Sequence, residues 1–90
     1  MSEEQRITEK DGALVLSKPV ISADGTVTVD FFNDRKQEAV DVTFLSGDAV
    51  PDRLPAIAAG SSSSSQISSN ATYRVSGNTV QPVNGTITIT

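Results

Sequence analysis

The chain has 90 residues, of which 7 are basic and 11 acidic, a formal net charge of −4, and no cysteine, histidine or tryptophan. A chain of this length predicts one domain with a small core. The missing thiol and imidazole groups exclude disulfides, cysteine nucleophiles and the commonest general base and transition-metal ligand, so we expect no cofactor and no enzyme activity. The acidic balance argues against binding to a nucleic-acid backbone, which needs clustered lysine and arginine.

Residues 1–12 are polar and end in Asp11-Gly12, a dipeptide typical of turns. We expect a loosely ordered N-terminal segment there, with a short strand at Arg6–Thr8 as the alternative, followed by a single β-sandwich domain over residues 13–90. No apolar stretch is long enough to predict membrane insertion, and no hydrophobic signal region follows Met1. These features predict synthesis in the cytoplasm, although a mature domain placed behind a new Met1 would look the same.

Two segments, Thr26–Phe32 and Val40–Leu45, alternate apolar and polar residues with the period of two that is typical of strands. Further short strands are expected at Ala13–Ser17, Ala71–Ser76, Thr79–Val83 and Thr86–Thr90. The dipeptide Asn84-Gly85 between the last two strands is the strongest hairpin signal in the chain.

The segment Ser46–Ser61 carries prolines and glycines and predicts a long connection, with a turn of helix at Ala56–Ala59. The serine run Ser61–Ser65 predicts a flexible polar loop that leads into a strand. Six to seven short strands separated by turns predict an all-β fold, namely a small antiparallel β-sandwich of immunoglobulin-like or jelly-roll-like type.

The stretch from Val27 to Ile67 resembles the middle of immunoglobulin-like β-sandwich domains. It has an alternating strand, a polar connection that contains Asn33, a second alternating strand, and a Leu54-Pro55 segment leading to the turn at Gly60-Ser61. The paired cysteines and the core tryptophan of immunoglobulin domains are absent from the sequence. The resemblance therefore implies an architecture and no particular function.

Asp30 and Asp41 lie on the polar faces of the two alternating strands. If these strands form a direct hairpin across residues 33–38, the register that aligns their apolar faces sets the two carboxylates opposite each other. Such a pair is a candidate metal site, with calcium as the ion, although calcium takes more oxygen ligands than two carboxylates supply. The alternative is that both carboxylates face solvent, or that the two strands belong to different sheets.

The segment Pro51–Ile57 contains two prolines, which stiffen an extended stretch and lower the entropy cost of binding a partner. The candidate contact residues in it are Pro51, Arg53, Leu54, Pro55 and Ile57. An exposed loop with Arg53-Leu54 at its centre is also how a protease inhibitor presents a pseudo-substrate. The other interpretation is a crossover between the sheets, with Leu54 and Ile57 packed at the edge of the core.

Phe32 is the one aromatic residue that we expect on an outer face, where it is a candidate for contact with a ligand. The segment Thr86–Thr90 alternates threonine with Ile87 and Ile89, and it has no proline or charged side chain to protect an exposed edge. This strand either lies covered within one sandwich or pairs with another chain.

The small, polar and acidic composition is similar to that of β-sandwich proteins of viral particles, such as decoration or tail proteins, and of surface fibres. We therefore expect a non-enzymatic structural or interaction module, incorporated into a particle, that contacts copies of itself or another protein. The alternatives are a sandwich that binds carbohydrate or peptide, and a protease inhibitor that presents the Pro51–Pro55 loop. Nucleic acid and membrane insertion are not expected, and calcium is the weakest alternative.

Overall fold

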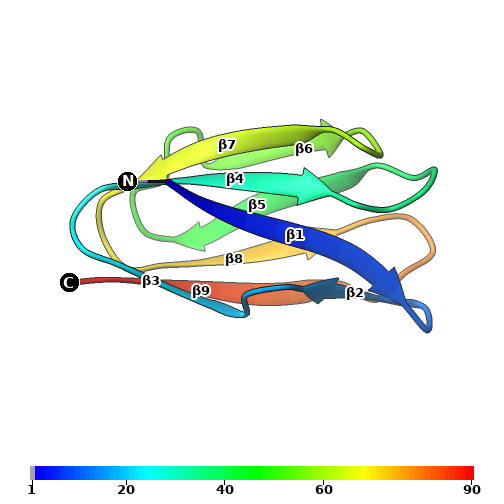
Figure 1. Cartoon of the computed structure of the whole chain (residues 1–90), viewed down its shortest axis with the longest axis horizontal. Coiled ribbons are helices and arrows are strands. Elements are labelled where there is room, and N and C mark those ends of the chain that lie inside the picture. Colours follow the sequence, from blue (N-terminus) through cyan, green and yellow to red (C-terminus); the bar gives the residue numbers. More distant parts are fainter. Residues whose placement is uncertain (1) are drawn as a thin grey trace.

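The computed structural model describes residues 2–90, and these residues form nine strands and no helix. The strands build two sheets that pack face to face around one core (Figure 1). The first sheet has the order β2-β1-β4-β7, formed by Ala13–Leu16, Ser2–Lys10, Val27–Asn33 and Ser62–Ile67. The second has the order β3-β9-β8-β5-β6, formed by Val20–Ala23, Val83–Ile89, Ala71–Ser76, Val40–Ser46 and Arg53–Ile57. The predicted all-β sandwich is confirmed, with nine strands in place of six to seven.

Both sheets are mixed, whereas the sequence predicted purely antiparallel pairing. Strand β1 runs parallel to β4, with Glu4 beside Asp30, and β3 runs parallel to β9, with Val20 beside Thr86. The remaining ladders are antiparallel. A parallel pair joins strands that no tight turn can connect, so local turn signals do not reveal it.

Strand β1 corrects the expectation of a loosely ordered N-terminal segment. Residues 2–10 form this strand, which lies between β2 and β4 inside the first sheet (Figure 1). Only Gln5 and Ile7 of the strand are buried, so its inward face is short and half polar. A hydrophobic alternation of two residues, one of them glutamine, is too weak to predict more than the short strand considered at Arg6–Thr8. Met1 lies outside the described residues.

The direct hairpin between the two strongest predicted strands does not form. Strand β4 pairs with β1 and β7, whereas β5 lies in the other sheet between β8 and β6. Residues 34–39 therefore cross from one sheet to the other. The apolar faces of β4 and β5 both point into the core from opposite sides, and this arrangement produces the same alternation as a hairpin.

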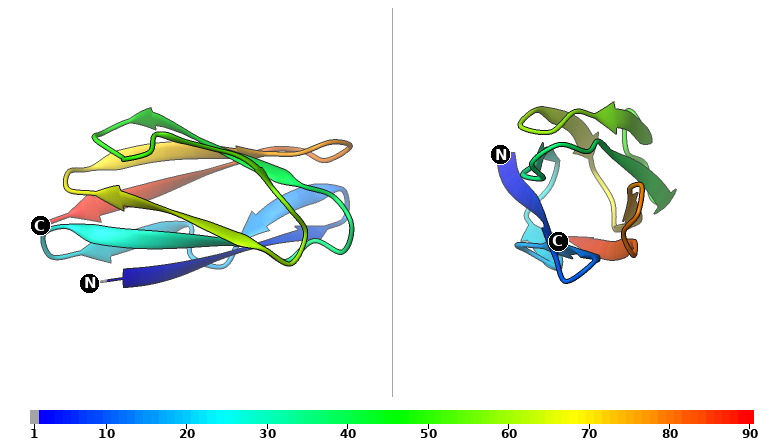
Figure 2. Two further views of the ribbon diagram at one scale, coloured as in Figure 1. Left: turned by 90° about the horizontal axis from the view of Figure 1, so that it is seen from above. Right: turned by 90° about the vertical axis from the view of Figure 1, so that its right-hand side faces the viewer.

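The core lies between the two sheets, which curve around it when the molecule is seen end-on (Figure 2). Val29 and Phe31 of β4 and Val42 of β5 are at most 1% exposed. The Tyr73 ring from β8 meets the Phe31 ring edge to face, with 5.1 Å between their centroids. This geometry is favoured for aromatic pairs and fixes how the two sheets face each other.

Asn84 and Gly85 lie inside strand β9 rather than in a hairpin turn. Gly85 pairs across the ladder with Tyr73, and a Cβ atom at this position would overlap Cζ and Oη of the Tyr73 ring. The glycine is therefore required by packing, not by a turn. Strand β9 is covered on both sides by β3 and β8, so the prediction that its edge could be exposed is wrong.

The segments expected to be a long connection and a flexible loop contain two strands. Strand β6 occupies Arg53–Ile57 in place of the predicted helical turn, and most of the serine run belongs to β7. Ser65 and Ile67 of β7 point inward and are 1% and 0% exposed. Serine is small enough to occupy an inward position at the edge of a sandwich. Because it is polar, an inward serine does not appear in a pattern of alternating apolar and polar residues.

Candidate functional site

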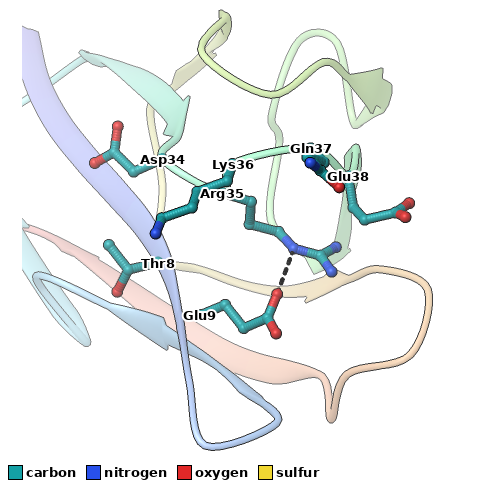
Figure 3. Close-up of a pocket in the computed structure, with 7 residues that line it drawn as sticks. All are labelled: Thr8, Glu9, Asp34, Arg35, Lys36, Gln37 and Glu38. Atoms are coloured by element: carbon teal, nitrogen blue, oxygen red, sulfur yellow. Dashed lines mark hydrogen bonds and ion pairs between the residues drawn. The ribbon is translucent and has the colours of Figure 1, made fainter.

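A pocket of about 670 Å³ lies at one end of the sandwich, between the end of β1 and the connection from β4 to β5 (Figure 3). Its lining residues are Thr8, Glu9, Asp34, Arg35, Lys36, Gln37 and Glu38. None of them was singled out from the sequence. The signal that could have found the pocket is the concentration of charged side chains in a short connection that follows a strand with every second residue buried.

Arg35 is the buried cation of this pocket, with a side chain only 2% exposed. Its Nε donates to Oε1 of Glu9 at 3.0 Å, as Figure 3 shows. Its Nη1 donates to the carbonyl of Ala39 at 3.1 Å, and its Nη2 donates to the carbonyl of Asn78 at 3.2 Å. The guanidinium thereby ties β1 to the β4–β5 connection and to the β8–β9 connection. A buried guanidinium needs partners of this kind for its donors.

Asn33 holds the same connection from inside. The side chain is fully buried, and its Nδ2 donates to the carbonyls of Glu38 and Ile57, each at 2.9 Å. Its Oδ1 accepts the backbone N–H of Arg35 at 2.9 Å. Asn33 and Arg35 point inward and continue the alternation of Val29 and Phe31. A search for apolar residues alone stops at Phe31 and misses these two buried positions.

The charges around the pocket largely neutralise one another. Arg35 pairs with Glu9, and Asp34 pairs with Arg6 of β1 at 3.0 Å. The Arg35 guanidinium donates to one carboxylate and two carbonyls, so it holds three segments together. Few of its N–H donors remain free to bind a substrate. The arrangement is therefore structural, and it supplies no nucleophile with an adjacent base.

A second buried polar cluster lies beneath β1. Gln5 is 0% exposed, and its Nε2 donates to Oη of Tyr73 at 2.8 Å and to the carbonyl of Lys18 at 2.6 Å. Its Oε1 accepts the backbone N–H of Lys18 at 2.9 Å. Burial raises the pKa of the Tyr73 hydroxyl above its ordinary value, and the hydrogen bond from Gln5 opposes this shift in part.

The raised pKa of Tyr73 predicts a loss of stability at high pH. Above pH of about 10 the tyrosine of the unfolded chain ionises first, so the unfolded state binds fewer protons than the folded state and the free energy of unfolding falls. Tyr73 is the single tyrosine and the chain has no tryptophan, so ultraviolet absorbance reports its ionisation directly. Urea unfolding across this pH range should show the slope, and Tyr73→Phe should remove it. An equal slope in that variant would contradict the prediction.

The structure does not bring Asp30 and Asp41 together, because they lie in different sheets. Asp30 lies between Glu4 and Ser64 in its sheet. Oδ1 of Asp41 accepts the backbone N–H of Ala56 at 2.6 Å. The described residues contain no group of three or more side chains suited to hold a metal ion. The candidate calcium pair therefore lacks its geometric basis.

The candidate contact residues of Pro51–Ile57 separate into two sets. Leu54 and Ile57 are 6% and 3% exposed and belong to the core, as the crossover interpretation expected. Pro51, Arg53 and Pro55 are exposed. Arg53-Leu54 lies in β6, where it pairs with β5, so it is not the projecting loop that a protease inhibitor needs.

Phe32 lies on an outer face as expected, but it is not an open platform. The guanidinium of Arg6 covers its ring, with Cζ 4.3 Å from the centroid. Arg6 is held there by Glu4 and Asp34, each at 3.0 Å. Such cation–π contacts cover the aromatic face that a sugar would use.

Ile87 and Ile89 were candidates for contact with another chain, and both lie in β9. Ile87 is 0% exposed, and Ile89 is partly buried against the core. Because β9 is an inner strand of its sheet, neither residue borders an open edge.

Three of the four edge strands of the sandwich are protected. Strand β2 continues into an isolated bridge with Gln81, whose carbonyl accepts the N–H of Leu14 at 3.0 Å. Strand β6 contains Pro55 and a left-handed residue, Ala56, with φ 51°. Strand β3 has only four residues and follows Pro19. Bridges, proline, irregular backbone and short length are the usual protections against added strands.

The fourth edge strand, β7, has none of these protections along its first half. It is six residues long and contains neither proline nor a charged side chain. The N–H of Asn33 donates to the carbonyl of Ser61 at 2.9 Å, and Phe31 pairs with Ser63 in the same ladder. In an antiparallel ladder, alternate residues point their backbone groups toward the partner strand. The groups of Ser63 and Ser65 therefore face β4.

The backbone groups of Ser62, Ser64 and Gln66 consequently face away from β4. Gln66 exchanges two hydrogen bonds with Val50, each at 2.9 Å, which confirms this orientation. The N–H and C=O groups of Ser62 and Ser64 point out of the first sheet without a backbone hydrogen bond, on the side where β6 of the second sheet comes near β7. We call these four backbone groups the β7 edge. Val50 lies at one end of it and is 71% exposed.

No family model and no curated protein matches the sequence. The fold matches solved structures, and it is cupredoxin-like. A multicopper oxidase matches 98% of this chain with a TM-score of 0.68 and 15% identity, and the chain spans 41% of that protein. A proline-to-glycine variant of amicyanin, in its reduced Cu(I) form, matches over 94% of this chain and 80% of its own (TM-score 0.62, 16% identity). Auracyanin B matches over 99% and 88% (TM-score 0.58, 22% identity).

These neighbours overturn the expectation of a viral-particle or surface-fibre module, because two of them are named for copper and none for such an assembly. Blue-copper sites use two histidines and a cysteine thiolate, with a weak axial ligand. This chain has no histidine and no cysteine, so the donor set of such a site does not fit. The fold is shared, and the chemistry of a copper–thiolate centre is not available to these residues.

Proposed function

We propose that this chain is a copper-free domain of cupredoxin-like fold that binds another protein by accepting one of its strands along the β7 edge. The observation that carries the proposal is the contrast between three protected edge strands and the unprotected serines of β7. Unpaired backbone N–H and C=O groups at a sheet edge are a template for an added strand. We propose no catalysed reaction, since the buried Arg35 of the pocket is held by Glu9 and by two backbone carbonyls.

The partner segment is expected to be extended and free of proline. Ser62, Ser64 and Gln66 present small or uncharged polar side chains on the outer face, so they impose little steric selection. The exposed Val50 offers an apolar contact at one end of the β7 edge. Main-chain hydrogen bonds supply affinity in this mode of recognition, and alternate side chains supply specificity.

Three further observations bear on the kind of partner. None of the described residues forms a helix of the length and hydropathy needed to cross a bilayer. Three basic side chains form ion pairs with carboxylates of the chain itself, namely Arg6, Lys18 and Arg35. The net charge of −4 opposes binding to a phosphate backbone.

Residue-resolved hydrogen exchange tests the β7 edge without a known partner. We expect the amides of Ser63 and Ser65 to exchange slowly, because they donate to β4, and those of Ser62 and Ser64 to exchange fast. A synthetic peptide with the sequence of residues 26–33, whose strand β4 is the native neighbour of β7, should then slow the two fast amides. Cu(II) salts should not change this result and should produce no blue absorption.

Ser64→Pro is the matched variant, because it removes an outward N–H and leaves the ladder to β4 intact. It should abolish the peptide effect with little loss of stability. Ser63→Pro removes a ladder hydrogen bond to β4 and should destabilise the fold more than Ser64→Pro does. Slow exchange of Ser64 in the free protein, or equal peptide binding by the Ser64→Pro variant, would refute the proposal.

A further inference from the structure

A row of four side chains crosses the outer face of the second sheet. Register pairs Arg53 of β6 with Thr43 of β5, Thr43 with Arg74 of β8, and Arg74 with Asn84 of β9. Both arginines and Asn84 are exposed, and Thr43 is half-buried. We call Arg53, Thr43, Arg74 and Asn84 the arginine row. It lies on the sheet opposite to the β7 edge.

The two arginines of this row differ from the other arginines of the described chain. Arg6 and Arg35 each form ion pairs with carboxylates, whereas Arg53 and Arg74 form none. Nε of Arg74 donates to Oδ1 of Asn84 at 3.2 Å, which orients the guanidinium and leaves its two Nη groups for another acceptor. An acidic protein thus carries two unneutralised guanidinium groups on one face.

The spacing of the row allows the two guanidinium groups to act together. Neighbouring strands are about 4.8 Å apart, so the Cα atoms of Arg53 and Arg74 are separated by about 10 Å, with Thr43 between them. Arginine side chains are long enough to converge over the threonine hydroxyl. Thr72 and Thr86, which pair with each other in the adjacent row, are exposed and uncharged.

Asp41 places a carboxylate on this face, two residues before Thr43 on the same strand. Its Oδ1 accepts the backbone N–H of Ala56, and it forms no ion pair with either arginine. The carboxylate of Asp41 therefore lowers the positive electrostatic potential of the arginine row without pairing with either guanidinium. This geometry predicts that its removal strengthens the binding of an anion.

We infer that the arginine row binds an acidic segment of a partner protein, with carboxylates of that segment held between Arg53 and Arg74. Arginine offers a planar fork of donors that matches a carboxylate, and the threonine hydroxyl adds one further donor. The rest of the surface carries a net negative charge and repels the same acidic segment. Binding of the segment is therefore confined to the arginine row. The inference uses no feature of the β7 edge, and either can fail without the other.

The test is a titration of the full chain with an acetylated and amidated hexaglutamate peptide, followed by NMR. We expect shifts of the Arg53 and Arg74 Nε–H signals and of amides in β5 and β8, and none from a hexaglutamine peptide. Arg53→Gln and Arg74→Gln should each weaken binding by about threefold, as expected for exposed charge pairs. Asp41→Asn should strengthen it.

Lys10→Gln and Lys36→Gln remove the same charge elsewhere on the surface and are the matched controls. They should leave the peptide affinity within error of the parent protein, and raised salt should weaken binding to the row. Equal losses in the lysine and arginine variants would show a diffuse charge effect and overturn the inference. Equal binding of hexaglutamine would overturn it as well. All five substituted side chains are exposed, so thermal unfolding should confirm that each variant is folded.

Discussion

Gly85→Ala is expected to lower the free energy of unfolding by about 3 kcal/mol, the upper end of the usual cost of overpacking a core. The added Cβ would overlap Cζ and Oη of Tyr73, which is 0% exposed and packed against Phe31. The ring can move only by losing its hydrogen bond from Gln5. For a domain of this size the melting temperature should fall by more than about 10 °C, which calorimetry or circular dichroism would measure.

The cause of this loss can be separated from a general weakness of β9. Thr86→Ala changes an exposed neighbour in the same strand and should alter stability by no more than about 0.5 kcal/mol. Tyr73→Leu destabilises on its own, but combined with Gly85→Ala it should cost less than the sum of the two changes. Simple additivity would show that the glycine serves some purpose other than making room for the ring.

Arg35→Met is expected to cost about 2 to 3 kcal/mol, because it removes the hydrogen bonds that a buried, charged guanidinium donates to Glu9 and to two backbone carbonyls. The methionine keeps most of the aliphatic volume and removes the hydrogen bonds to Ala39 and Asn78. Hydrogen exchange of the 34–39 and 77–82 connections should accelerate together, since one guanidinium holds both. Urea unfolding would measure the loss of stability.

Two comparisons locate the effect of Arg35. Arg53→Met removes an exposed arginine and should change stability by no more than about 0.5 kcal/mol. Glu9→Gln keeps the guanidinium and a hydrogen-bond acceptor, and the Glu9 side chain is 42% exposed, so its cost should be small. Equal losses for Arg35→Met and Glu9→Gln would mean that the ion pair, and not the contacts with the two carbonyls, carries the stabilisation.

The β-sandwich was predictable because its central strands follow the rule that apolar residues alternate with period two. Val29, Phe31 and Val42 all point inward as that rule requires. The rule fails for β1 and β7, whose inward positions include Gln5 and Ser65. Polar residues at buried positions are stable only with distant hydrogen-bond partners, and the sequence does not show which partners those are.

The surfaces on which the two proposals rest could not be predicted from the sequence, for a related reason. Ser62 and Ser64 become edge groups because β7 pairs with β4 alone and ends the first sheet, an order that no local signal reveals. Arg53 and Arg74 become neighbours only through the ladders that β5 forms on both sides. Gly85 next to Asn84 gave a turn signal, and the true constraint came from Tyr73 across the ladder.

The parallel pairing of β3 with β9 has a consequence for how the chain reaches its native state. These strands come from opposite ends of the described chain. Strand β1 likewise pairs with a strand that comes later in the sequence, β4. Topologies dominated by such distant pairings have high contact order and fold in milliseconds to seconds rather than microseconds. During synthesis, β3 emerges long before its partner, so the second sheet closes only after β9 has been made.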